Sequence, residues 1–152
     1  MIRGSCLCGR VAFAIDRAEG PFEFCHCPRC RKASGSAFVA GLGVRAEAFH
    51  WLTGRADVRT FEAPLREQAP AYRRCFCPTC GSPVPDPEAP GDRIELPAGL
   101  LEDDPRVRPD RHIFVEHRAP WYEIGDDLPR LDAATLRRHR ASGEGAPGSE
   151  ES

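Results

Sequence analysis

The amino-acid sequence predicts a single, mainly β domain that is rich in loops and binds metal. Three observations support this prediction. Short apolar runs of strand length recur along the chain, and its 14 glycines and 15 prolines interrupt them. All eight cysteines fall into three tight clusters. Neighbouring cysteines this close rarely form disulfides with each other, whereas their thiolates converge readily on tetrahedral Zn²⁺.

The predicted elements begin with a hairpin. The runs Ile2–Cys6 and Val11–Ile15 flank the first cysteine cluster, which is expected at the turn between them. Further strands are expected at Phe22–Cys25, Ala37–Leu42, Asp57–Phe61, Ala71–Phe76, Arg93–Leu96 and His112–Glu116, giving about seven or eight in total.

Few helices are expected. Residues Pro28–Ser34 suit one or two helical turns that Gly35 would end, and Asp132–Arg140 is the one candidate for a longer helix. The segment Ser142–Ser152 is rich in Gly, Ser and Glu and is expected to be disordered. We therefore predict one zinc-binding domain over residues 1–131, followed over 132–152 by a short helix and a tail.

Composition narrows the classes of function. The chain has 152 residues, with 21 Lys and Arg against 23 Asp and Glu, for a net charge of −2. This balance disfavours nucleic acid as a partner. No apolar run is long enough for an export signal or a membrane span, so we expect a protein of the reducing cytoplasm whose thiols stay free for metal. A disulfide framework is the less favoured alternative.

The number of cysteines leaves two arrangements open. Eight thiolates could form two closed four-cysteine sites, which would be structural, or one closed site, one open three-cysteine site and one spare residue. Cys6 and Cys8 pair naturally with Cys77 and Cys80, because each pair sits in a turn and is followed directly by glycine. Gly81 is expected to adopt a positive φ in its turn.

The remaining cluster holds three thiolates within six residues, Cys25, Cys27 and Cys30. A zinc ion bound there would keep one open position, where an incoming thiol would lose its proton. The substrate predicted from these residues is therefore a thiol. Cys75 stays unassigned: it could complete the open site, support the closed one or pack in the core.

The charged residues and histidines near this cluster also carry predictions. Arg29, Arg31 and Lys32 lie beside this cluster and could form a cationic rim around its substrate, although a solvated surface explains them equally well. His26 lies between two predicted ligands and should point away from the metal, in a surface or hydrogen-bonding role rather than as a proton shuttle. A structural role is expected for His112.

Four segments together resemble the glutathione-dependent formaldehyde-activating enzyme family, also called the centromere protein V/GFA domain family. They are Gly4–Val11, Cys25–Lys32, Phe76–Ser82 and His112–Val115 with Ala119-Pro120-Trp121. The resemblance implies a β-tent fold of several small antiparallel sheets. It also implies two zinc ions: a structural one at Cys6, Cys8, Cys77 and Cys80, and a more labile catalytic one at Cys25, Cys27 and Cys30.

The activity that the resemblance implies is the addition of glutathione to formaldehyde, giving S-hydroxymethylglutathione. In reverse, this is a carbon–sulfur lyase reaction. The expected partners are a small glutathione-like thiol and a small aldehyde, with no membrane; a homo-oligomer is compatible with the sequence. The alternative function is a non-catalytic, zinc-stapled module that binds a protein or a nucleic acid.

Overall fold

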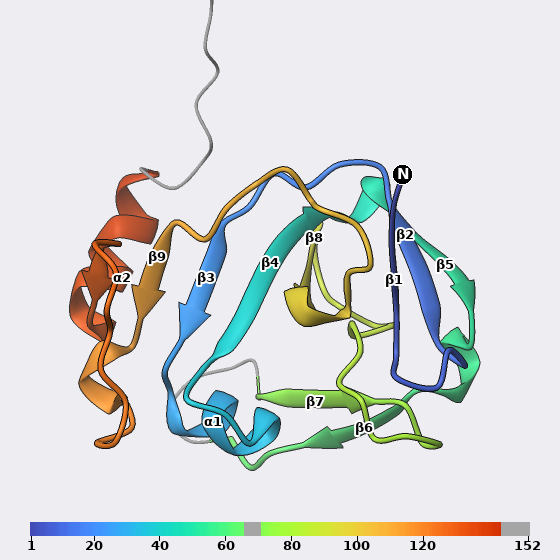
Figure 1. Cartoon of the computed structure of the whole chain (residues 1–152), viewed down its shortest axis with the longest axis horizontal. Coiled ribbons are helices and arrows are strands. Elements are labelled where there is room, and N and C mark those ends of the chain that lie inside the picture. Colours follow the sequence, from blue (N-terminus) through green and yellow to red (C-terminus); the bar gives the residue numbers. More distant parts are fainter. Residues whose placement is uncertain (66–70, 144–152) are drawn as a thin grey trace, which may run out of the picture.

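The computed structural model describes residues 1–65 and 71–143, and within them the fold is mainly β (Figure 1). Ten strands form three small sheets, accompanied by two α-helices and four short 3₁₀ turns in this described part of the chain. The predicted mainly β fold class, with several small sheets and few helices, is confirmed. No described helix is both long and apolar enough to cross a membrane.

The first sheet has the order β1-β2-β5. Strands β1 (Ile2–Ser5) and β2 (Ala12–Ile15) form the predicted antiparallel hairpin, and β5 (Phe49–Thr53) pairs with the other edge of β2. We did not predict β5, although Phe49 and Trp51 alternate with exposed neighbours in the two-residue period of a half-buried strand.

The second sheet has the order β10-β9-β3-β4-β8. Its strands are β3 (Phe22–Cys25), β4 (Val39–Arg45), β8 (Arg93–Pro97), β9 (Arg111–Ile113) and β10 (Arg130–Leu131). The β3–β4 and β4–β8 pairs are antiparallel, whereas β9 runs parallel to both β3 and β10. The strand predicted at His112–Glu116 is too long, because Phe114 has a φ of 56° and a 3₁₀ turn follows it.

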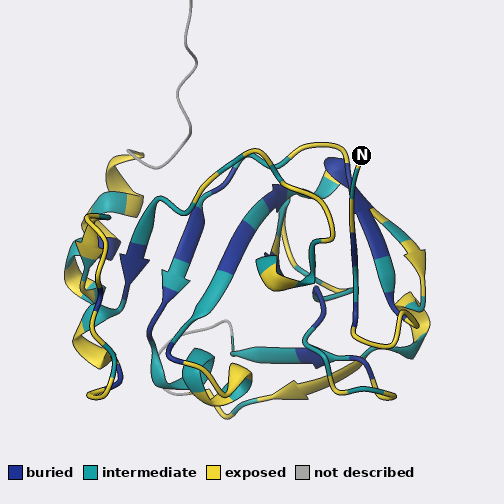
Figure 2. Cartoon of the chain, viewed as in Figure 1, coloured by how far each residue is buried: buried dark blue, intermediate teal, exposed yellow. Residues whose placement is uncertain are grey.

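A two-stranded ribbon of β6 (Arg59–Glu62) and β7 (Arg73–Phe76) lies across one end of the larger sheet (Figure 1). The core lies between the two larger sheets, where Phe13 stacks on Phe49 with ring centroids 5.2 Å apart. The strands of the second sheet also carry buried residues (Figure 2). Leu42 and Leu96 of this sheet complete the core.

Both predicted helices are present. Helix α1 spans Pro28–Ser34, and Gly35 ends it with a φ of 66°, as expected. Cys27 is its N-cap, with the sulfur accepting the Cys30 N–H. Helix α2 spans Ala133–Ser142 and packs Leu136 against Cys25 and Ile113. Most of the predicted disordered tail lies outside the described residues, and the domain boundary at residue 131 remains a prediction.

Candidate metal centres

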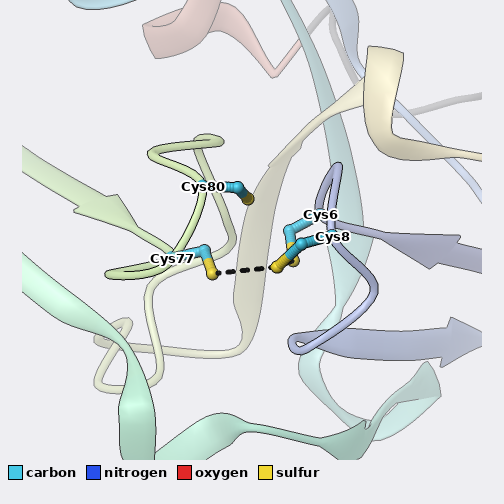
Figure 3. Close-up of side chains that lie close together, drawn as sticks. All are labelled: Cys6, Cys8, Cys77 and Cys80. Atoms are coloured by element: carbon cyan, nitrogen blue, oxygen red, sulfur yellow. Dashed lines mark hydrogen bonds between the residues drawn. The ribbon is translucent and has the colours of Figure 1, made fainter.

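The first cysteine group joins two turns that are far apart in the sequence. The sulfurs of Cys6, Cys8, Cys77 and Cys80 all lie within 4.8 Å of one another, and they point into the space between the β1–β2 turn and the turn after β7 (Figure 3). The Sγ atoms of Cys8 and Cys77 are 3.8 Å apart, and those of Cys6 and Cys8 are 3.6 Å apart. Four thiolates bound tetrahedrally at about 2.3 Å would have their sulfurs about 3.8 Å apart. The donor set therefore fits zinc.

Local backbone geometry explains why the sulfurs converge. Gly9 and Gly81 have φ values of 77° and 74°, and their N–H groups donate to the carbonyls of Cys6 and Cys77. The positive φ predicted for Gly81 is confirmed. Each turn thus folds back on its first cysteine, in a conformation that residues with a Cβ adopt at a cost.

Ser82 ties the two turns together. Its hydroxyl oxygen accepts the Leu7 N–H at 3.0 Å and lies 3.3 Å from the sulfur of Cys80. Hydrogen bonds to the sulfur from the hydroxyl and N–H of Ser82, with further ones from Cys8, lower the pKa of Cys80 to about 5. A readily formed thiolate is the form that binds metal. Ser82 directly follows the Cys-Pro-Thr-Cys-Gly motif, but nothing in the motif indicated this role.

The second group is the predicted trio. The sulfurs of Cys25, Cys27 and Cys30 lie within 4.8 Å of one another, where the end of β3 meets α1. Hydrogen bonds from the neighbouring thiols lower the pKa of Cys27 to about 2, and the same proximity raises the pKa of Cys25 to about 12. The pKa of Cys30 is raised too. The three sulfurs thus share one negative charge, and a bound cation would allow all three to become thiolates.

Cys75 belongs to neither group. It is buried beside Cys6, Val11, Cys77 and Val84, and its sulfur lies 3.3 Å from the hydroxyl of Thr60. Burial raises the pKa of this thiol. Of the roles left open for Cys75, core packing is the one that its position supports.

A buried polar chain lies beside the trio. His26 and His112 are both fully buried, with 2.8 Å between His26 Nε2 and His112 Nδ1. His112 Nε2 lies 3.0 Å from a carboxylate oxygen of Asp126. Burial lowers the pKa of His26 to about 4. His26 is thus a hydrogen-bonding residue rather than a surface one. The sequence around Asp126 gave no sign of its role, because Asp126 lies 14 residues after His112 and far from His26 in the chain.

An open pocket of about 730 Å³ adjoins the trio. Its lining includes Cys30, Arg29, Tyr72, Arg74 and Glu95. The guanidinium of Arg29 stacks over the Tyr72 ring, 5.2 Å from its centroid. Of the three cations predicted to form a rim, Arg29 lines the pocket. The second cysteine group therefore borders a space that can admit a small molecule.

Comparison with known proteins agrees with the sequence motifs. The family model described as glutathione-dependent formaldehyde-activating enzyme matches residues 1–117. The chain belongs to this family. A curated relative from Halomonas elongata, named "Putative glutathione-dependent formaldehyde-activating enzyme", is 30% identical over 129 residues, covering 82% of this chain and 81% of the relative.

A solved structure of a Rhodobacter sphaeroides protein also matches. It has a TM-score of 0.48 and 22% sequence identity, covering 68% of this chain and 92% of that one. The family match ends before β10 and α2, so these elements lie beyond the part of the chain that the family model describes.

Proposed function

We propose that the chain is a zinc-dependent carbon–sulfur lyase that forms and cleaves a thiol–aldehyde adduct of the S-hydroxymethylglutathione type. One observation carries the proposal: one cysteine group has four sulfurs, and the other has three and borders an open pocket. A site with four protein ligands is closed, whereas three ligands leave a position for substrate. Membership of the family supports the same reading.

Two zinc ions per chain are proposed. Cys6, Cys8, Cys77 and Cys80 would hold a structural ion, and Cys25, Cys27 and Cys30 would hold a more labile one. The second ion would supply acidity to a thiol substrate, stabilising it as thiolate at neutral pH. A reducing, cytoplasmic location would keep all eight cysteines unpaired, as they are here.

The pocket suits an anionic thiol. Arg29 and Arg74 line it and form no ion pair with any acidic group in the described residues. They are therefore free to bind the carboxylates of glutathione, which would hold the thiol near the second cysteine group. Holding the thiol and a small aldehyde together in the pocket replaces a bimolecular encounter with a favourably oriented one.

The test combines metal content with turnover. Wild-type protein is expected to bind two zinc ions and to catalyse adduct formation from glutathione and formaldehyde. Cys27→Ser should lose one zinc and the activity, whereas Cys75→Ser should keep both. Two zinc ions and full activity in Cys27→Ser would refute the site assignment. Two tightly held ions and no turnover in the wild type would favour the non-catalytic binding module instead.

A further inference from the structure

Glu95 lies on the face of the five-stranded sheet that bears the second cysteine group. On β8 it pairs with Gly43 of β4, and Gly41 of β4 pairs with Glu23 of β3. Paired residues share a face of the sheet, and so do residues two apart along one strand. Glu95, Glu23 and Cys25 therefore all belong to one face, from three adjacent strands.

The missing side chain of Gly41 makes room for the Glu95 carboxylate. A Cβ atom built on Gly41 would lie 2.7 Å from Glu95 Oε1 and 3.2 Å from its carboxyl carbon. The carboxylate thus lies against β4 at Gly41, two residues from Val39, the partner of Cys25. Two residues of a strand span roughly 7 Å. Glu95 is exposed as a residue because the pocket it shares with Cys30 is open.

Glu95 differs from Glu23 in its partners. The Glu23 carboxylate is buried and lies 3.3 Å from Arg140 and 3.9 Å from Arg111. Glu95 makes no hydrogen bond or ion pair within residues 1–65 and 71–143. A carboxylate without a partner, beside a pocket, is available to a ligand.

The surroundings of Glu95 disfavour its charged form. Although Glu95 is reached by solvent through the open pocket, the protein atoms packed around its carboxylate partly desolvate it and raise its pKa, and the negative charges of Glu23 and Cys27 add to this effect. Arg140 of α2 acts in the opposite direction. Two further arginines line the same pocket. Arg73 is already neutralised by ion pairs with Asp86, Glu62 and Glu88, whereas Arg74 forms no ion pair in the described residues. A carboxylate of raised pKa is a stronger base than an ordinary one, and its acid form can return the proton.

We propose that Glu95 is the proton carrier of the thiol–aldehyde reaction, an inference that rests on the function proposed above. Its carboxylate takes the proton from the thiol. The sulfur then forms the C–S bond to the carbonyl carbon, and the C=O π electron pair moves to oxygen. That oxygen takes the proton back from Glu95, so the thiol and aldehyde become a hemithioacetal with no net gain or loss of protons. Cleavage runs the same steps in reverse.

The first test compares two conservative variants. Glu95→Gln should keep two zinc ions, lower kcat/KM about 100-fold and lose the acidic limb of its pH profile. Glu47 is the matched control, because it lies outside the pocket and, within residues 1–65 and 71–143, pairs only with Arg17 at 3.5 Å. Glu47→Gln should behave as wild type. If Glu95→Gln keeps kcat/KM within twofold and the same pH profile, Glu95 does not carry the proton.

A second test displaces the carboxylate without removing it. The three atoms nearest to the Gly41 Cβ position all belong to the flexible Glu95 side chain, so Gly41→Ala should fold and push the carboxylate aside. Its kcat/KM should fall about tenfold relative to wild type. In the Glu95→Ala background, the same Gly41→Ala change should cause no further fall in kcat/KM. An equal loss in both backgrounds would mean that Gly41 acts independently of Glu95.

A third readout does not depend on turnover. In zinc-loaded protein carrying ¹³C-labelled glutamate, the resonance absent from Glu95→Gln identifies the Glu95 carboxyl. Its pKa should lie above 4.5, the ordinary value, and saturation with glutathione alone should protonate it. An ordinary pKa with no response to glutathione would overturn the inference. An active, zinc-dependent enzyme with this negative result would refute Glu95 alone, whereas glutathione-linked protonation without turnover would refute the lyase proposal alone.

Discussion

The ring nitrogens His26 Nε2 and His112 Nδ1 lie 2.8 Å apart in the interior of the protein. Asp126 accepts a hydrogen bond from His112 Nε2–H, and this bond lowers the pKa of Asp126. With that nitrogen protonated, a neutral His112 accepts from His26 at Nδ1. Asp126 thereby orients the His112 ring, and His112 in turn orients the His26 ring. His26 lies between Cys25 and Cys27 of the three-cysteine group.

Replacing His112 should reveal the energetic value of this chain. His112→Phe leaves the buried N–H of His26 without an acceptor, so we expect a loss of about 2 kcal/mol of unfolding free energy. His50 is the control: it makes a 2.9 Å contact with Asp16, but both side chains are about half exposed. His50→Phe should cost less than about 1 kcal/mol. Urea denaturation of the zinc-loaded variants measures both values, and equal losses would contradict the prediction.

Cys75 and Cys77 provide a second contrast, because both are buried but differ in their contacts. Cys77→Ala removes one sulfur of the four-cysteine group, so we expect the protein to lose one zinc ion and to unfold in mild denaturant. Cys75→Ala should retain both ions and lose about 1 kcal/mol through weakened packing. Zinc analysis and thermal melting distinguish the two. Loss of zinc from Cys75→Ala would mean that Cys75 is a ligand.

The Asp86–Arg73 pair predicts a pH dependence of stability. Burial alone would raise the pKa of Asp86, but hydrogen bonds from Arg73 and the Glu88 N–H outweigh it and hold the pKa below 3.8. Protonation is therefore easier in the unfolded chain. The stabilisation is complete above about pH 5 and declines as the pH falls through 3.8 towards the folded-state value.

Asp86→Asn should flatten this part of the stability curve, because it removes the group that titrates differently in the two states. Asp127→Asn is the control, since Asp127 makes no hydrogen bond in the described part of the chain. Chemical denaturation between pH 3 and 6 provides the measurement. Identical curves for wild type and Asp86→Asn would show that the ion pair contributes nothing to the acid sensitivity.

Gly54 should be the more sensitive of two glycines with positive φ. Alanine at Gly91 meets open space and suffers only left-handed strain, about 1 kcal/mol. Alanine at Gly54 adds a contact of its Cβ with the Arg10 carbonyl oxygen, so we expect a loss above about 2 kcal/mol. Thermal melting of Gly54→Ala and Gly91→Ala gives the comparison, and similar melting temperatures would contradict it.

Local patterns predicted the fold better than distant pairings did. The β1–β2 hairpin and the end of α1 at Gly35 depend on neighbouring residues, and both are present. The strand Phe49–Thr53 was missed because it is a half-exposed edge strand whose pairing with β2 reaches back across the chain. The predicted strand at His112–Glu116 ran too far because Phe114 adopts a left-handed conformation without being glycine.

The same contrast between local and distant signals separates the cysteine groups from Glu95. Short spacing within each motif indicated which sulfurs would gather, and the structure brings both sets together. Glu95 carries no such signal, because a glutamate in a strand ordinarily lies on a solvated face. Its place beside the trio depends on the β4–β8 register and on the space left by Gly41, which only the assembled sheet determines.

The contact between Cys8 and Cys77 also has a topological consequence. The two residues are 69 positions apart, so a metal ion that binds both closes a loop of nearly half the chain. In the chain-entropy model of cross-links, a loop of this length removes roughly 4 kcal/mol of conformational freedom from the unfolded ensemble. A metal ion that stays bound during unfolding would thus act as a reversible cross-link, and refolding would start from a chain in which the two turns are already held together.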